Sequence, residues 1–121
     1  DSRRMATIKR VLELVSSGRA TCVMFPADDR ALQFIDYCTM AGLKIPEAVS
    51  VTGVDGVFPR WQDLGLATLR LPVEGVVARA SQVMVSRLEN PRQPVIHETL
   101  VGHFVPGRTL ATAHQFSGGG R

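Results

Sequence analysis

Short apolar segments alternate with amphipathic helical patterns in the first half of the chain, and this alternation constrains the fold more than any other feature. Residues 7–17 carry apolar side chains at helical spacing, and residues 20–25 form a short apolar segment. A second helical pattern, residues 28–42, precedes a second apolar segment, residues 49–54. Strands that alternate with helices usually pair in parallel in a sheet that the helices cover. We therefore predict an α/β fold, a mostly parallel sheet with helices on both faces.

The second half of the chain continues this alternation. It contains an irregular stretch, a strand, a helix and a final strand, over residues 56–65, 66–71, 73–89 and 95–105. Pro72 stands where a helix accepts a proline in its first turn. The glycine-rich residues 114–121 are expected to form a flexible tail. The expected order is therefore helix, strand, helix, strand, loop, strand, helix, strand.

The composition limits the class of protein. A length of 121 residues corresponds to one domain or less, and an apolar fraction of 45% is sufficient for a core. The net charge is only +3, and the one basic cluster is small: Arg3 and Arg4, with Lys9 and Arg10 nearby. Nucleic-acid binding needs a denser basic patch. We therefore expect no direct contact between this chain and DNA.

The cysteines and the hydropathy pattern predict a cellular location. Cys22 and Cys38 lie in apolar segments without the close spacing of a metal or redox pair, so both are expected to be reduced core thiols. No apolar run approaches the ~20 residues of a membrane span, and the opening residues show no signal-peptide pattern. The expected location is the cytoplasm, away from membranes. The chain does not begin with methionine, which suggests part of a longer protein.

Three carboxylates follow predicted strands. Asp28 and Asp29 come after the first strand, and Asp55 comes at the end of the second. Ligands of parallel sheets bind beyond the carboxyl ends of the strands, so these side chains are candidates for polar ligand recognition. Phe25 and Trp61 are candidates for a flat wall against a sugar or ring. The alternatives are a helix cap at Asp28 or Asp29 and a turn residue at Asp55.

Catalytic uses of these residues have less support. A receiver-type phosphoacceptor needs a lysine and a hydroxyl on later strand ends, but Thr68 lies inside a strand and is followed by Arg70. A serine nucleophile elbow is absent from the sequence. His97, His103 and His114 have no partners at metal-ligand spacing. We therefore predict no catalytic residue, no metal site and no cofactor.

Two longer segments resemble a known family. The run TCVMFPADDRALQFIDYCTMAGLKIPEAVSVTGVDG is similar to the strand-"ANDxxA"-helix-"AGxxVPxDVSVxGxDD" pattern of the lactose/galactose repressor (LacI/GalR-type) family. The run LATLRLPVEGVVARASQVMVSRLENP resembles the family's "LTTVxQPxxxxGxxAxxxLxxRLxxP". The resemblance extends over about residues 4–108. It implies a periplasmic-binding-protein-like effector domain, in which two α/β lobes are joined by crossing strands.

The resemblance also implies an organisation of the chain. Residues 1–113 would be the C-terminal part of an effector domain, and residues 114–121 a tail. Within it, residues 1–71 would form the core of the C-terminal lobe. Residues 72–91 would be a helix of the other lobe, and residues 95–110 a returning strand. DNA would be bound only by an N-terminal helix-turn-helix domain outside this chain.

The family pattern assigns roles to particular residues. Asp55 matches the first Asp of "GxDD", which hydrogen-bonds the effector in relatives, and Asp28 matches the Asp of "ANDxxA". Ala27 and Leu71 stand where relatives have polar Asn and Gln, which favours a different or more apolar effector. The expected effector-binding residues are Asp55, Asp28, Phe25, Ala27, Trp61 and Leu71.

Self-association is expected at two surfaces. The helix over residues 28–42 and the loop around Trp61 resemble the family's homodimer surface, with the candidates Leu32, Ile35, Tyr37 and Trp61. The helix over residues 73–89 would expose an apolar stripe of Val76, Val77, Ala80 and Met84. We expect dimerisation or swapping to cover that stripe.

The sequence thus predicts a binding module rather than an enzyme. It would be the effector-sensing part of a cytoplasmic transcription regulator, typically a repressor, that forms a homodimer and binds a sugar or related metabolite between two lobes. A periplasmic sugar-binding protein of the same fold and a receiver-like phosphoacceptor are the alternatives.

Overall fold

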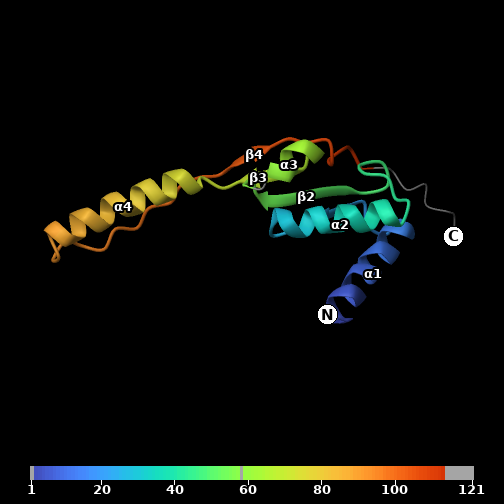
Figure 1. The fold of residues 1–121 in the computed structure, drawn as a ribbon, viewed down its shortest axis with the longest axis horizontal. Coiled ribbons are helices and arrows are strands. Elements are labelled where there is room, and N and C mark those ends of the chain that lie inside the picture. Colours follow the sequence, from blue (N-terminus) through green and yellow to red (C-terminus); the bar gives the residue numbers. More distant parts are fainter. Residues whose placement is uncertain (1, 58, 114–121) are drawn as a thin grey trace.

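The computed structural model describes residues 2–57 and 59–113, and these residues form an α/β unit with an extended arm (Figure 1). The elements in order are α1 (Ser2–Ser16), β1 (Cys22–Met24), α2 (Asp28–Met40), β2 (Ser50–Asp55), α3 (Pro59–Leu64), β3 (Ala67–Arg70), α4 (Val73–Glu89) and β4 (His103–Val105). This is the predicted order with one addition, because the stretch predicted to be irregular contains the short helix α3. The predicted tail, residues 114–121, lies outside the described residues.

The sheet has four strands in the order β1-β2-β3-β4. The pairs β1–β2 and β2–β3 are parallel, and β3–β4 is antiparallel. The predicted α/β class with a mostly parallel sheet is therefore confirmed. The last strand is much shorter than predicted, since only His103–Val105 pairs with β3. Residues 95–102 run beside α4 instead and have no strand to pair with (Figure 1).

The core lies between α2 and one face of the sheet. Helix α2 buries Ala31, Leu32, Phe34 and Cys38, and the opposing strand contributes Val51. The Phe25 and Phe34 rings pack against each other at a centroid distance of 5.3 Å. Other elements join the same cluster, through Val15 of α1, Trp61 of α3 and Val49 and Leu66 before β2 and β3. This core fixes the carboxyl end of β2 against the amino end of α2.

Helix α2 ends where its sequence indicates. Gly42 has a φ of +72°, a left-handed conformation that favours glycine. The N–H of Gly42 donates to the carbonyl of Thr39, and the N–H of Leu43 to that of Cys38. These bonds satisfy carbonyls at the end of the helix, as in a glycine-terminated cap. The chain then turns back towards β2.

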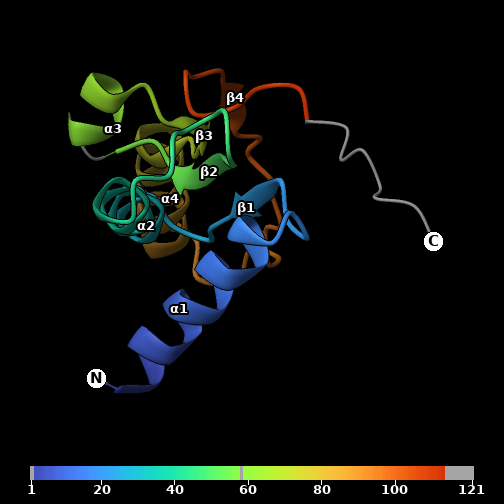
Figure 2. The same ribbon diagram turned by 90° about the vertical axis from the view of Figure 1, so that its right-hand side faces the viewer.

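The other face of the sheet has no helix over it within residues 2–57 and 59–113. Figure 2 shows α2 on one side of the strands only. Met24 and Phe104, whose side chains belong to the opposite face, are 80% and 53% exposed. The predicted second layer of helices is therefore not seen in this part of the chain. Sequence hydrophobicity alone does not reveal whether the layer that should cover a strand is present.

The uncovered face also explains why one cysteine is buried and the other exposed. Cys38 lies on the sheet-facing side of α2 and is fully buried. This burial raises the pKa of its thiol from 9.0 to about 11. Cys22 lies at the edge strand β1 and is exposed. Both cysteines are free, as predicted, but only Cys38 is a core thiol. The prediction for Cys22 is wrong because β1 is an edge strand with one bare face.

The arm consists of α4 and the segment that returns beside it (Figure 1). None of the residues of α4, all of which the structure describes, is buried. The predicted exposure of the apolar stripe on this helix is confirmed, since Val76, Val77 and Met84 are all exposed. Arg79 forms an ion pair with Glu98 of the returning segment. Pro72 is the N-cap of α4 rather than its first residue, a small correction to the prediction.

Candidate ligand-binding site

The carboxyl ends of the parallel strands form one edge of the sheet, and several predicted site residues lie there. Asp55 is the last residue of β2 and pairs in register with Arg70, the last residue of β3. Leu71 follows directly, and its N–H donates to the carbonyl of Asp55 at 3.1 Å. Phe25 follows β1, and its N–H is bonded to the carbonyl of Thr52. These residues therefore lie at the carboxyl edge of the sheet, where the sequence placed them.

Asp55 has an unusual backbone conformation. Its φ is +119°, a region that favours glycine, and among the described residues it is the one non-glycine with a positive φ. Gly56 continues the turn with a φ of +67° and is buried. A Cβ at Gly56 would lie 2.8 Å from Cβ of Arg70, so no larger residue fits there without movement. Backbone strain of this kind accumulates at functional sites and must be held by surrounding structure.

Asp28 is placed differently from the prediction. Its side chain is fully buried, and its Oδ1 accepts a hydrogen bond from the Thr68 hydroxyl at 2.6 Å. Its Oδ2 accepts a bond from the N–H of Gly56 at 2.8 Å. The N-cap of α2 is Ala27, and no side chain caps the helix, so neither Asp28 nor Asp29 is the cap considered from the sequence. Asp28 therefore connects α2 to the turn beside Asp55.

Sequence reasoning did not assign Thr68 and Gly53 to this site. Thr68 is a fully buried polar residue inside β3, and Gly53 is its register partner on β2. Glycine at this position lets the Asp28 carboxylate approach the strand, because a Cβ there would overlap Oδ1 of Asp28. The sequence carries no signal for this role, because the pairing of Thr68 with Gly53 and the burial of Asp28 are seen only in the structure.

The other predicted effector-binding residues differ in their exposure. Phe25 and Ala27 are half-buried near the strand ends, and Leu71 is exposed at the same edge. Trp61 is only 7% exposed and belongs to the core cluster. Its ring is therefore not an open wall for a ligand in this structure.

The predicted dimer residues also differ in their exposure. Leu32 is 6% exposed and, like Trp61, contributes to the core, so neither presents a surface side chain. Ile35 and Tyr37 are half-buried on α2 and remain accessible. Beside them, the Asp36 carboxylate accepts two hydrogen bonds from Arg60 of α3, at 2.8 and 3.2 Å. This bonding raises the pKa of the Arg60 guanidinium and ties the two helices together at the surface.

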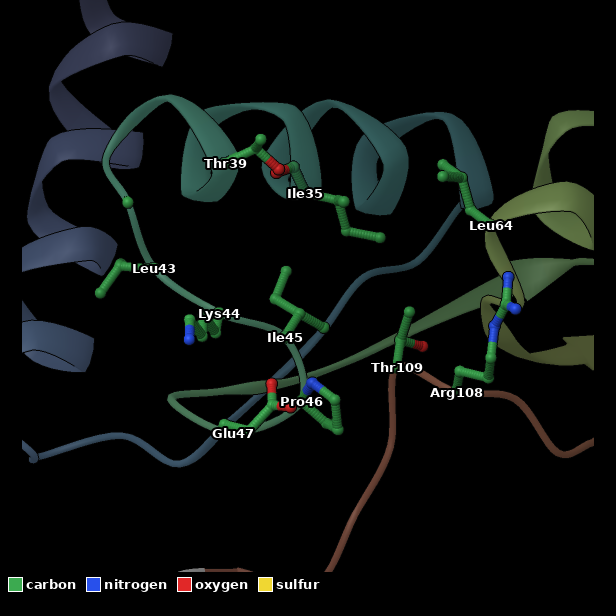
Figure 3. A pocket seen from close by; sticks show the side chains of 11 residues that line it. Ile35, Thr39, Leu43, Lys44, Ile45, Pro46, Glu47, Leu64, Arg108 and Thr109 are labelled. Atoms are coloured by element: carbon green, nitrogen blue, oxygen red, sulfur yellow. The ribbon is translucent and has the colours of Figure 1, made fainter.

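A surface hollow of about 780 Å³ lies at the other end of the sheet (Figure 3). It is bounded by the second half of α2, by the loop over residues 42–47 and by Arg108 and Thr109. The hydroxyl of Thr109 is already bonded to the carbonyl of Val51 and the N–H of Ala67. A second hollow, of about 450 Å³, lies between α4 and the segment that returns beside it. Neither hollow is lined by Asp55.

The described residues contain neither a metal-binding cluster nor a membrane-spanning helix. Residues 2–57 and 59–113 contain no group of three or more His, Cys, Asp or Glu side chains arranged to hold a metal ion. In the same part of the chain, no helix has the length and apolar character needed to cross a bilayer.

The chain is an α/β sheet with polar groups at its carboxyl edge, the place where ligands of such sheets bind, and comparison with known proteins specifies the family. Residues 1–110 match the model of the periplasmic binding protein-like domain. The chain belongs to this family, and solved LacI family regulators share its fold. It is 38% identical over 98 residues to an HTH-type transcriptional regulator of Mycobacterium tuberculosis. That match covers 79% of this chain and 26% of the relative.

Solved structures agree with this assignment. A probable transcription regulator from Thermus thermophilus superposes with a TM-score of 0.66 at 30% identity, covering 75% of this chain and 35% of that one. A LacI family transcriptional regulator from Lactobacillus casei with bound sucrose gives a TM-score of 0.70 at 24% identity, which supports the fold alone. This second match covers 87% of this chain and 38% of that one. The chain thus spans about a quarter to two fifths of the length of these relatives.

Proposed function

We propose that this chain is the effector-sensing part of a bacterial LacI/GalR-type transcription regulator, and that Asp55 is its polar anchor for a small molecule. The observation that carries the proposal is the placement of Asp55. It lies at the carboxyl edge of the parallel sheet, in a backbone conformation that aspartate on its own disfavours. A strained carboxylate at the ligand-binding edge of such a sheet is best accounted for by a binding role.

The proposed effector is a sugar or a related metabolite. One structural relative, the Lactobacillus casei regulator, was solved with sucrose bound. Ala27 and Leu71 supply apolar contacts at this edge, so the effector has an apolar side or fewer hydroxyls facing these positions. Carboxylate oxygens are acceptors only, so Asp55 selects hydroxyl or N–H donors on the ligand.

The proposed mechanism is a population shift rather than a chemical reaction. The effector would bind between this lobe and a second lobe, and its contacts would favour the closed arrangement. Closure would alter the geometry of a homodimer whose surface on α2 includes Ile35 and Tyr37, and hence the affinity of a helix-turn-helix domain for its operator. A cytoplasmic repressor that performs no catalysis fits the relatives, which are transcription regulators.

Calorimetry on the intact protein tests the role of Asp55. A panel of mono- and disaccharides and nucleobases is titrated into the wild type, Asp55→Ala and the control Asp63→Ala, which removes an exposed carboxylate from α3. We expect Asp55→Ala to weaken binding by about 10- to 100-fold, as for a lost hydrogen bond to a charged group. Asp63→Ala should bind like the wild type. Unchanged affinity in Asp55→Ala would refute the proposed anchor.

A further inference from the structure

A buried polar cluster beneath the strand edge consists of Asp28, Gly53, Gly56 and Thr68. Its members come from α2, β2, the turn after β2 and β3. Asp28 and Thr68 are fully buried, and Gly56 is buried as well. Burying a carboxylate is costly unless its oxygens are hydrogen-bonded. Both oxygens of Asp28 accept such a bond here, one from Thr68 and one from Gly56.

The cluster also depends on the absence of a side chain at Gly53. A Cβ at that position would overlap Oδ1 of Asp28 and would lie 3.2 Å from its Cα. Helix α2 therefore approaches β2 closely at Gly53. The close approach lets the short Asp28 side chain reach the N–H of Gly56 across the end of the strand.

The turn at Asp55 is consequently held from both sides. On one side, Asp28 holds the N–H of Gly56, the residue that follows Asp55. On the other side, the N–H of Leu71 holds the carbonyl of Asp55 at 3.1 Å. Between these two bonds the backbone of Asp55 keeps its φ of +119°. A conformation of this kind persists only where its surroundings impose it.

We propose that Asp28 is a positioning residue that, oriented by Thr68, fixes the backbone turn that presents Asp55 to the ligand. The proposal rests on the ligand-binding role of Asp55 and revises the direct effector contact expected for Asp28 from the sequence. Asp28 acts through the peptide N–H of Gly56, and its own oxygens are already occupied. Thr68 orients the carboxylate so that Oδ2 faces the turn.

The deciding experiment needs no ligand. The intact protein is labelled with [15N]glycine, and amide hydrogen exchange is followed at each glycine by NMR. In Asp28→Ala, exchange at Gly56 should accelerate by about 10- to 100-fold, which corresponds to the loss of one charge-assisted hydrogen bond. Gly18 and Gly65, whose N–H groups donate to the carbonyls of Val15 and Gln62, serve as internal controls. Their exchange should accelerate less than that of Gly56, because among these three glycines only Gly56 loses its acceptor.

Two Thr68 variants separate orientation from packing. Thr68→Val keeps the shape of the side chain but removes the hydroxyl, whereas Thr68→Ser keeps the hydroxyl and removes a methyl group. Gly56 should exchange faster in Thr68→Val and at the wild-type rate in Thr68→Ser. Crystal structures of the variants then report φ of Asp55, which should leave the positive region in Asp28→Ala.

The outcomes distinguish this proposal from the proposed function. Equal acceleration at Gly18, Gly56 and Gly65 in Asp28→Ala would mean loss of general stability and would overturn the positioning role. An unchanged φ of Asp55 in that variant would also overturn it. Wild-type ligand affinity in Asp55→Ala would instead overturn the binding role of Asp55, whatever the exchange at Gly56.

Discussion

Helices α2 and α4 have similar amphipathic sequences but very different surroundings. Helix α2 buries Ala31, Phe34 and Cys38 against the sheet, and its first residue, Asp28, is hydrogen-bonded to two other elements. None of the residues of α4, which the structure describes in full, is buried, and the helix contacts mainly the segment that returns beside it. An apolar stripe on a helix therefore predicts a partner surface, but it does not indicate whether that surface belongs to the same chain.

The stripe on α4 needs such a partner. Val76, Val77 and Met84 are exposed together along one arm, and exposed apolar patches of this kind usually mark an interaction surface. Dimerisation or swapping that covers this stripe stays a prediction.

Truncation of a core residue should have the largest effect. Phe34→Ala removes a buried ring of α2 that packs against Phe25, so the free energy of unfolding should fall by about 3–5 kcal/mol. Met84→Ala on α4 removes an exposed side chain and should change it by less than about 0.5 kcal/mol. Urea denaturation measures both. Similar losses for the two variants would show that α4 is covered in solution.

Removal of the buried carboxylate should have the next largest effect. Asp28→Ala leaves the Thr68 hydroxyl and the N–H of Gly56 buried without their acceptor, so the unfolding free energy should fall by about 2–3 kcal/mol. The matched variant on the arm is Arg79→Ala, which breaks the exposed ion pair with Glu98. That variant should be close to neutral because solvent screens the pair. The same urea titrations compare them, and a larger loss for Arg79→Ala would reverse the expected ranking.

Relief of backbone strain at Asp55 should have a smaller effect, a gain in stability of the glycine variant over the alanine variant. Glycine accepts the positive φ of Asp55 without strain, whereas alanine does not. Asp55→Gly should therefore be about 1 kcal/mol more stable than Asp55→Ala, since the strain relieved exceeds the added flexibility of the unfolded chain. Both variants should lose ligand affinity. Thermal unfolding and calorimetry measure the two properties, and greater stability of Asp55→Ala would contradict the strain at this position.

The two thiols should differ in reactivity. In the native protein at pH 8, a thiol reagent such as DTNB should modify Cys22 at the exposed edge strand and leave Cys38 unmodified until the protein unfolds. Burial raises the pKa of Cys38 to about 11, so the folded state favours the neutral thiol. Its stabilising contribution is present below pH 9 and declines as the pH rises from 9 to 11. Rapid modification of both thiols under native conditions would contradict the buried position of Cys38.

Much of this fold follows from the sequence, whereas the hydrogen bonding at the site does not. Alternating patterns predicted the parallel strands, and Asp55 was expected at the correct edge because parallel strands end together. The sequence did not indicate that Asp28 turns inward, since an acidic residue at the start of a helix is equally compatible with a cap. Only the close approach of α2 at Gly53 brings its carboxylate to Thr68 and Gly56.

Long-range packing accounts for the other differences. Trp61 was expected beside a ligand, but its short helix places it in the core. The extended pattern of residues 95–102 predicted a strand, although a strand forms only where a neighbouring backbone offers hydrogen bonds. A sheet with helices on both faces was expected, yet Met24 and Phe104 remain exposed because the described residues cover one face.

A crystal structure of the intact protein with a ligand identified by calorimetry tests the central claim most directly. We expect a carboxylate oxygen of Asp55 to accept a hydrogen bond from the ligand. We also expect Asp28 to keep its bonds to Thr68 and Gly56 and not to touch the ligand. A ligand bound directly by Asp28, with Asp55 turned away from it, would contradict the account.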